Sequence, residues 1–397
     1  MIEKTMQPQE QTMRPQEQTG QPPQQPMNIA GQAQGTPGAY QAGTCLMAHG
    51  WSDRLEAARA ACGRPDWVPA RVMSEQRHLY HLLTEAGTCQ AEVSGRFRAS
   101  AAGTGDFPCV GDWVMAQVRP GEDAATIHAV LPRQTRFSRR AAGPRADEQV
   151  MAANFDAVLL AMSLNDDYNL RRLERYLVMA WDSGAMPVVV LTKLDLARDA
   201  EALIRDVEQL AAGVPVLAVS AVTGEGMSGL DPWAVPGKTL VVLGSSGVGK
   251  STLMNRLAGK ELARTQAIRE DDARGRHTTT HRELYRLDSG VLVLDTPGIR
   301  ELQLWESDTG MEDAFPDIQA LADTCRFRDC THDREPGCAV REAVACGSLP
   351  ATRYDSWRKL GREMAFISQK SSHASREAER KFGRMVTRMQ RSNPKNH

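Results

Sequence analysis

Apolar and polar positions alternate in short runs over the first third of the chain. Five such runs fall between residues 70 and 132, with the sequences RVMSE, HLYHLLT, AEVSGRF, DWVMAQV and TIHAVL. Alternation indicates strands with one buried face, and several short strands at close spacing indicate a small β-barrel. A small β-domain of another kind would fit the pattern alone. A helical segment, Ala48 to Trp67, precedes these runs.

Continuous apolar runs replace the alternating ones in the middle of the chain. They cover Val188–Leu191, Val216–Val219 and Leu240–Leu243, and a fourth, VLVLD, ends at Asp295. Runs of this kind indicate buried strands. A helix-like segment, STLMNRLAG, follows the third run.

The first 43 residues differ from everything that follows. They are rich in Gln and Pro, nearly free of apolar side chains, and repeat TMQPQEQ as TMRPQEQ. Such a stretch buries too little apolar surface to offset its ordering entropy, so we expect disorder. The composition leaves open whether this tail is passive or adds a contact.

The segment GSSGVGKS fits the phosphate-binding pattern G-x-x-x-x-G-K-[ST] without a mismatch, between a strand-like and a helix-like segment. Backbone N–H groups of such a loop surround the β-phosphate, and the helix dipole adds to their effect. We expect Lys250 to reach the β- and γ-phosphates and Ser251 to bind Mg²⁺. The alternative is a plain glycine-rich turn between a strand and a helix, but such a turn does not require the Lys-Ser pair. The predicted contacts are Gly244, Ser245, Ser246, Gly247, Val248, Gly249, Lys250, Ser251 and Thr252.

A guanine-reading element is expected at TKLD, Thr192 to Asp195, where a strand-like run ends. The Asp195 carboxylate can accept both the N1–H and the N2–H₂ of guanine, a donor pair that adenine lacks, and Lys193 belongs to the same site. Ser220 and Ala221 end the next strand-like run and would support the base. TKLD alone would also fit a plain strand-turn. Its position before the phosphate loop indicates a circularly permuted motif order.

A switch loop is expected in ARGRHTTTHREL, between the phosphate loop and the last strand-like run. Its consecutive threonines make a poor helix, and one hydroxyl would complete the Mg²⁺ sphere when the γ-phosphate is present. We expect Thr279 to do so, with Thr280 as the alternative. In the DTPG segment, Asp295 would hold Mg²⁺ through water and the Gly298 N–H would contact the γ-phosphate.

His277 is the candidate catalytic residue. Ile299 follows DTPG at the position where many GTPases carry a water-orienting Gln, and an apolar side chain cannot orient water. His277 is the nearest candidate in the switch segment. A solvated loop histidine remains the alternative.

A metal site is predicted near the C-terminus, where Cys325, Cys330, His332 and Cys338 stand at the spacing C-x4-C-x-H-x5-C. Three thiolates and one imidazole match a closed tetrahedral zinc site. Without a signal peptide, a compact Cys/His cluster is more readily explained by zinc than by disulfides. Reduced cysteines without a metal are the alternative. Cys346 is off the spacing and is left out.

Composition and charge constrain the fold and function less than the motifs do. The 397 residues carry a net charge of −1 and a 41% hydrophobic share, enough for two or three domains with real cores. No run of eighteen apolar residues and no signal pattern occurs, so we expect no membrane span and a cytoplasmic protein. Five arginines fall between residues 133 and 145, and twelve Lys/Arg stand against four Asp/Glu from residue 351 onward. These clusters favour contacts with RNA phosphates, although either could be a solvated face.

The ordered motifs TKLD, SA, GSSGVGKS, GRHTTT, DTPG and CRFRDCTHDREPGC resemble the ribosome small-subunit-dependent GTPase A family (RsgA, also called YjeQ). The likeness extends upstream through AEVSGRFR, PCVGDWV and ANFDAVLLAMSLN, and covers roughly Val68 to the C-terminus. Thr192 departs from the commoner Asn, so we expect one stabilising side-chain amide to be lost.

The resemblance implies a multidomain fold: an OB-fold barrel, a circularly permuted α/β P-loop GTPase domain and an α-helical zinc-binding domain. The expected parts are a disordered tail (1–43), a helical connector (44–69), the RNA-binding barrel (70–140), the GTPase domain (141–312) and the zinc domain with a basic C-terminal helix (313–397).

The resemblance also implies a GTP hydrolase, stimulated by the small ribosomal subunit, that acts late in the maturation of that subunit. The implied cofactors are one structural Zn²⁺ and Mg²⁺ with GTP. The implied partners are the subunit, its rRNA and GTP or GDP, with no membrane, and we expect a monomer. A metabolic kinase and an RNA-binding module with a vestigial nucleotide site are the rival functions. TKLD opposes the first, and intact Lys250, Ser251 and Asp295 oppose the second.

Overall fold

Five strands near the start of the described chain form a closed barrel. The computed structural model of the protein describes residues 44–76, 78–140, 148–165, 167–260, 282–295 and 309–365. The barrel strands are β1 (Val68–Gln76), β2 (Leu79–Thr84), β3 (Gly87–Val93), β4 (Trp113–Val118) and β5 (Ala124–Val130). Around the barrel the order is β1-β2-β3-β5-β4, and β4 pairs again with β1; the β3–β5 pair is parallel. This five-stranded closure is that of an OB-fold, as expected.

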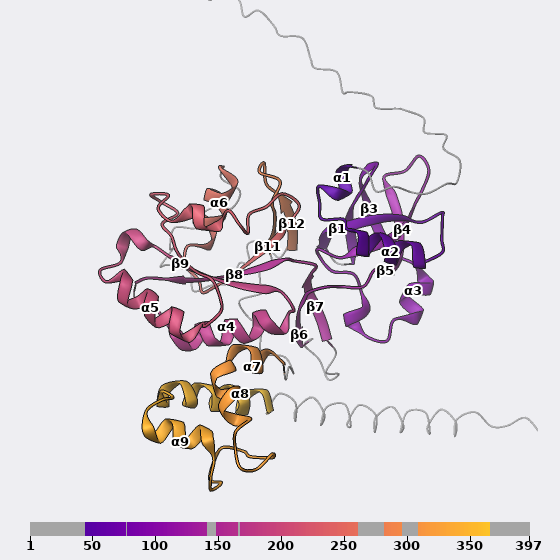
Figure 1. Ribbon diagram of the computed structural model, residues 1–397. Helices are drawn as coiled ribbons and strands as arrows, with labels where there is room; N and C mark the ends of the chain where they lie inside the picture. Colours follow the sequence, from indigo (N-terminus) through magenta and orange to yellow (C-terminus); the bar gives the residue numbers. More distant parts are fainter. Residues whose placement is uncertain are drawn as a thin grey trace, which may run out of the picture. The chain divides into compact units, whose positions relative to one another are not determined.

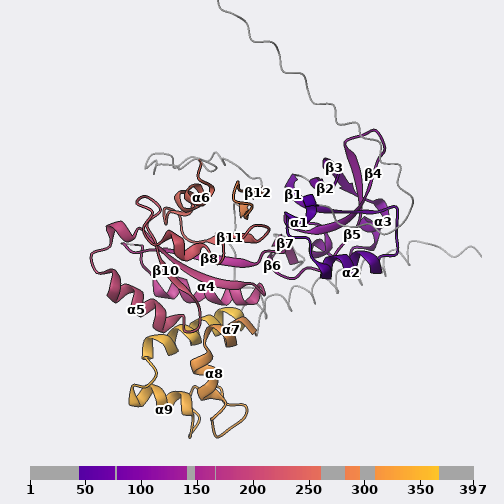
Figure 2. The ribbon, with the colours of Figure 1, turned by 45° about the horizontal axis from the view of Figure 1, so that its top comes forward.

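Alternate residues of these strands fill the barrel. Ala70 and Val72 of β1, and Tyr80 and Leu82 of β2, are fully buried in one cluster, so the predicted alternation is the in–out alternation of the barrel wall. One predicted strand was too long. The run AEVSGRF leaves β3 after Val93, because the next residue caps the helix α3 (Gly95–Ser100), beside β5 in Figure 2.

The segment before the barrel also differs from the prediction. In place of one helix over 48–67, two short helices occur, α1 (Thr44–Met47) and α2 (Asp53–Ala61). Gly50 lies between them at φ +89°, where a Cβ would approach the Gly237 carbonyl oxygen to 2.9 Å. A continuous helix cannot pass through a left-handed residue, which explains the break.

A buried ion pair holds the barrel loops. Arg133 contacts the Asp112 carboxylate through Nε at 2.8 Å and through Nη2 at 2.7 Å, and Asp112 is completely buried. Asp112 also accepts a hydrogen bond from the Cys109 N–H at 2.8 Å. Arg133 belongs to the arginine run that suggested an RNA contact. For this residue that interpretation is wrong, because its guanidinium is bound by Asp112 and by the carbonyl oxygens of Gly105 and Phe107.

Replacing Asp112 by alanine is expected to lower the free energy of unfolding by about 3–5 kcal/mol, since it strands the buried charge of Arg133. The matched control is Glu122→Ala, whose partner Arg119 and own side chain are each 59% exposed; about 0–1 kcal/mol is expected there. Urea denaturation measures both. A loss for Asp112→Ala as small as that of the control would contradict the structural role assigned to the pair.

The second part of the chain is built on a mostly parallel sheet. Its strands are β8 (Ala157–Ser163), β9 (Met186–Thr192), β10 (Val216–Ala218), β11 (Thr239–Leu243), β12 (Arg282–Arg286) and β13 (Leu292–Asp295). They lie in the order β10-β9-β8-β11-β13-β12, and only β12 is antiparallel to its neighbour β13. The continuous apolar runs of the sequence correspond to β9, β10, β11 and β13. Nearly all residues of β9 and β11 are buried, whereas those of the edge strand β10 are only partly buried.

Helices cover both faces of this sheet. Leu160 and Met162 of β8 pack into one core with α4 (Leu170–Asp182) and α5 (Ala200–Leu210). Ala157 and Leu159 face the other core, with α6 (Lys250–Ala258). Figure 1 shows α4 and α5 on one side of the strands and α6 on the other. Two 3₁₀ turns, η2 (Leu194–Leu196) and η3 (Met227–Leu230), lie in the connections.

A strand pairing connects the barrel with this sheet. β12 pairs antiparallel with β1, which places Ser74 opposite Glu283, and the Arg282 guanidinium lies 3.5 Å from the Glu75 carboxylate. The strands β6 (Arg136–Arg140) and β7 (Glu148–Ala153) form a separate two-stranded sheet between the two parts of the chain. The expected boundary after residue 140 stays a prediction.

The last described segment is helical and packs on α4. It comprises α7 (Thr309–Ala314), α8 (Pro316–Ala322), α9 (Ala339–Cys346) and a helix over 351–365. Arg353 binds both oxygens of Asp317 at 2.6 Å and lies 3.6 Å from Glu174 of α4, which is buried. Within the described part of the chain, no helix combines the length and apolar character needed to cross a membrane. Most of the basic helix expected over Tyr354–Gln390 lies outside the described residues.

Candidate functional site

The phosphate-binding loop follows β11, the strand at which the order of strands in the sheet changes direction. β8 to β10 extend to one side of β11, and β13 and β12 extend to the other. The crevice at the carboxyl ends of the strands at such a point is the usual ligand site of an open α/β sheet. The loop 244–249 leaves β11 at this point and enters α6 at Lys250, which is the strand–loop–helix context the sequence predicted.

Glycines are needed at two positions of the loop. A Cβ on Gly244 would lie 2.6 Å from the Ala161 carbonyl oxygen of the neighbouring strand. Gly249, which precedes α6, has φ +99°, a conformation that residues with a Cβ rarely adopt. The loop therefore runs close to β8 and turns sharply into the helix, so its N–H groups can face one anion.

Side chains hold the loop from two directions. Lys250 Nζ donates to the carbonyl oxygen of Gly244 at 2.8 Å and also to that of Ser245. Thr192, at the end of β9, donates from Oγ1 to the Val248 carbonyl oxygen at 2.6 Å. The loss expected from Thr192 in place of Asn is therefore compensated in part, because the hydroxyl itself ties the guanine element to the phosphate loop.

The guanine element follows β9 directly. Lys193 has φ +60° and precedes η2, so the exposed Asp195 lies within that turn, at the carboxyl edge of the sheet. The Leu194 N–H donates to the Val219 carbonyl oxygen at 3.1 Å, so TKLD and the Ser220-Ala221 segment are adjacent. The structure thus brings the two predicted base-contacting segments together. Their role toward a base stays a prediction.

Asp195→Asn is expected to shift the base preference from guanine toward xanthine. The two acceptors of the carboxylate become one acceptor and one donor, which suits a carbonyl at the base C2 in place of the amino group. We expect kcat/KM for GTP to fall by at least about 10²-fold, and kcat/KM for XTP to rise.

Competition between the two nucleotides measures the shift. Asp199→Asn is the matched control, because Asp199 caps α5 and Asn is an equally good cap. An unchanged preference for GTP over XTP in Asp195→Asn would refute the base assignment.

The switch residues cannot be placed. His277, Thr279, Thr280 and Gly298 lie outside the described residues. Asp295 ends β13, with its backbone opposite Glu283 of β12. Ser251 and Thr252 lie in the first turn of α6, beside the phosphate loop. The predicted Mg²⁺ site is therefore described only on the Ser251 side.

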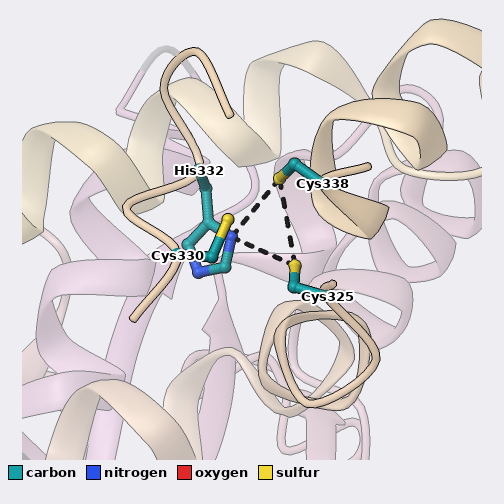
Figure 3. A group of neighbouring side chains, drawn as sticks. All are labelled: Cys325, Cys330, His332 and Cys338. Carbon is teal, nitrogen blue, oxygen red and sulfur yellow. Dashed lines mark hydrogen bonds between the residues drawn. The ribbon is translucent and has the colours of Figure 1, made fainter. Parts of the chain in front are cut away.

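The four predicted zinc ligands converge (Figure 3). Their ligand atoms all lie within 4.8 Å of one another, in a group formed by Cys325, Cys330, His332 and Cys338. Cys325 follows α8 and Cys338 caps α9, while the other two lie on the intervening loop. His332 adopts φ +59°, which turns its ring toward the sulfurs.

The distances fit a zinc ion. The Sγ atoms of Cys325 and Cys338 are 3.9 Å apart, and each is 3.5 Å from His332 Nδ1. Tetrahedral Zn–S and Zn–N bonds imply separations of about 3.8 Å between sulfurs and about 3.6 Å between sulfur and nitrogen. Burial lowers the pKa of His332, and this effect exceeds the opposite effect of the nearby Glu335 carboxylate. The lowered pKa favours the neutral imidazole, which is the form that binds metal.

One supporting residue was missed by sequence reasoning. The Glu335 carboxylate accepts hydrogen bonds from the N–H groups of Thr331, Asp333 and Arg334 at 3.0–3.1 Å, and from the Thr331 hydroxyl. The Thr331 hydroxyl is the main cause that lowers the pKa of Glu335 to about 2. An acid inside a short Cys/His loop was the available signal. Glu335 fixes the turn that presents His332.

Comparisons with known proteins agree with this geometry. The RsgA GTPase family pattern matches residues 130–305. A curated relative from Opitutus terrae, a small ribosomal subunit biogenesis GTPase RsgA, is 46% identical over 356 residues, which is 87% of this chain and 97% of the relative. One from Lactiplantibacillus plantarum is 46% identical over 317 residues, 80% of this chain and 89% of that relative.

Similar solved structures support the same family. YjeQ from Thermotoga maritima is 27% identical, with a TM-score of 0.57 over 75% of this chain and 99% of that one. YloQ, described as a circularly permuted GTPase, is 25% identical, with a TM-score of 0.55 over 77% of this chain and 96% of that one.

An ABC transporter pattern also matches residues 233–393. That range holds the phosphate loop, which P-loop ATPases and GTPases share, but it excludes TKLD. The extended identity to curated relatives and the permuted motif order decide the assignment. The chain is a GTP hydrolase and belongs to the RsgA GTPase family.

Proposed function

We propose that this protein hydrolyses GTP while bound to the small ribosomal subunit, and that the subunit stimulates the reaction late in its own maturation. The observation that carries the proposal is the adjacency of the phosphate loop and the guanine element at the strand-order reversal, in a chain whose curated relatives are named small ribosomal subunit biogenesis GTPases. The protein would act in the cytoplasm, where that subunit matures.

The chain's own residues would position the triphosphate for attack by water. Loop N–H groups and Lys250 would bind the β- and γ-phosphates, and Asp195 would select guanine. Mg²⁺, held by Ser251 and Thr279, would neutralise charge that develops on the phosphate oxygens. Binding and release of the γ-phosphate would then give the bound subunit two states to distinguish.

Contacts with rRNA are proposed for the barrel, for the strand β6 that follows it, and for the C-terminal segment. Arg136 is 57% exposed, although it lies 3.2 Å from Glu148. In the loop between the first two zinc ligands, Arg326 and Arg328 are exposed on either side of Phe327, which is 41% exposed. Exposed arginines beside an aromatic ring suit phosphates and unstacked bases. A single structural Zn²⁺ would hold this loop through the four converging ligands.

The test is GTP hydrolysis with and without purified small ribosomal subunits. We expect turnover to rise in the presence of small subunits, and not with large subunits at the same concentration. Co-sedimentation with the small subunit in the GTP-bound state, followed by release after hydrolysis, is the second expected result. Equal turnover with both subunits would refute the proposed stimulation.

His277→Ala tests whether the chain supplies its own catalytic group. If His277 orients the water, kcat on the subunit should fall by roughly 10²–10⁴-fold, while GTP affinity changes little. The variant should dock on the subunit and fail to leave. His281→Ala, in the same segment, is the matched control. Single-turnover rates on saturating subunits within about threefold of wild type would place the catalytic group on the ribosome.

A further inference from the structure

A carboxylate outside the nucleotide motifs contacts the phosphate loop. The Ser245 hydroxyl donates a hydrogen bond to Asp167 Oδ2. Asp167 lies in the connection between β8 and α4, and β8 is the strand that pairs with β11 on the guanine side. Asp167 is not part of the phosphate-loop pattern, the guanine element or the switch, so the function described above gives it no role.

Asp167 is itself held in place from both ends of its loop. Arg172, in the first turn of α4, lies 2.8 Å from Asp167 Oδ1 and donates a second hydrogen bond to the Asp167 carbonyl oxygen. The Asp167 N–H donates to Asn165 Oδ1 at 3.3 Å, and that oxygen also accepts from the Ser163 hydroxyl at 2.7 Å. The carboxylate is therefore fixed before it meets Ser245.

The charge of Asp167 strengthens this contact. Partial burial raises the pKa of Asp167, but hydrogen bonds from Ser245 and Arg172 outweigh that effect, so the pKa lies below the ordinary carboxyl value. The group is ionised at neutral pH. A hydroxyl bound to a carboxylate makes a shorter and stronger hydrogen bond than one between neutral groups.

The residue that Asp167 holds is central to the loop. The Ser245 carbonyl oxygen accepts from Lys250 Nζ, so Ser245 is tied by its side chain on one side and by its backbone on the other. A glycine-rich loop loses much conformational entropy when it orders around an anion. Contacts that order it in advance leave more of the binding energy for the nucleotide.

We propose that Asp167 is a positioning residue for the phosphate loop: its carboxylate holds Ser245 in the conformation that binds phosphate. The proposal rests on the GTPase activity of the family and adds a residue on the β8–α4 connection to the site. It predicts a loss of affinity for GDP and GTP alike, because both nucleotides need the same loop conformation. Chemistry at saturating GTP should be affected little.

The test is a double-mutant cycle on GDP affinity in the full-length chain. Asp167→Ala and Ser245→Ala are each expected to raise the Kd for GDP about tenfold, the change that one charge-assisted hydrogen bond produces. The double variant should again show about a tenfold change, whereas independent effects would give about 100-fold. For Asp167→Ala, the variant outside the nucleotide motifs, we expect kcat at saturating GTP to stay within about threefold of wild type.

Two further variants separate positioning from general support of the fold. Asp167→Asn keeps an acceptor for the Ser245 hydroxyl and should restore the Kd to within about threefold of wild type. Asp199→Ala removes another loop carboxylate, the cap of α5, and should lower thermal stability without changing the Kd.

Two results would overturn the proposal. One is a double variant whose Kd change equals the product of the single changes. The other is an Asp167→Ala variant that loses thermal stability while its Kd for GDP stays within about twofold of wild type. Wild-type binding is measured in the same series. If the wild-type chain failed to bind GDP, the nucleotide assignment itself would fall, and this proposal with it.

Discussion

Replacing Lys250 by alanine is expected to reduce kcat/KM for GTP by roughly 10²–10³-fold or more, since it removes a charged donor from the phosphate site. In the structure, Lys250 Nζ is already aimed by hydrogen bonds to the carbonyl oxygens of Gly244 and Ser245. The variant should fold normally, because Lys250 lies at the partly exposed start of α6.

Steady-state hydrolysis and circular dichroism together test this expectation. Lys260→Ala is the matched control, because Lys260 follows α6 and makes a surface ion pair with Asp288 at 2.8 Å. The control should turn over GTP at the wild-type rate. Wild-type turnover by Lys250→Ala would show that the phosphate-loop assignment is wrong.

Cys338→Ser is expected to remove bound zinc and to unfold the C-terminal helical segment. A structural zinc ion contributes roughly 10–16 kcal/mol to folding in zinc-finger peptides, so the loss of a ligand is costly. Cys338 is buried, caps α9 and packs in the same core as Ile318 and Val340. Release of the metal would therefore expose apolar surface that now packs on α4.

Zinc content and thermal unfolding measure the effect. The wild-type chain should carry one zinc per chain, and Cys338→Ser should carry almost none and unfold at a lower temperature. Cys346→Ser is the matched control, because Cys346 is an exposed cysteine just outside the cluster. It should keep both properties. A wild-type chain without zinc, or a Cys338→Ser variant with a full equivalent, would refute the metal assignment.

Much of the fold and of the candidate site could be predicted because it depends on residues close together in the sequence. The phosphate loop is contiguous in sequence. Glycine is needed at positions such as Gly244, where a Cβ would collide with the Ala161 carbonyl oxygen. The zinc ligands lie within fourteen residues, so their spacing nearly determines their geometry. Alternating apolar runs predicted the barrel strands, since side-chain direction alternates along a strand, and continuous apolar runs predicted strands of the second sheet.

Two features that the sequence did not reveal depend on contacts between distant residues. Arg133 looked like one member of a basic run, but its partner Asp112 lies 21 residues earlier and buries its charge. Thr192 looked like a weaker substitute for Asn, but its hydroxyl reaches Val248, 56 residues later. The predicted strand AEVSGRF was too long for a local reason, the Ser94 helix cap.

By itself, the sequence determined the family, the motif order, the phosphate-loop pattern and the Cys/His cluster, because each depends on residues that are neighbours along the chain. Only the tertiary structure decided how the barrel closes, that Arg133 pairs with Asp112, and that Asp167 contacts Ser245 across 78 residues. The physical reason is that these contacts depend on strand order and register. No single segment of the sequence determines strand order or register, because both depend on how all strands of the sheet pack together.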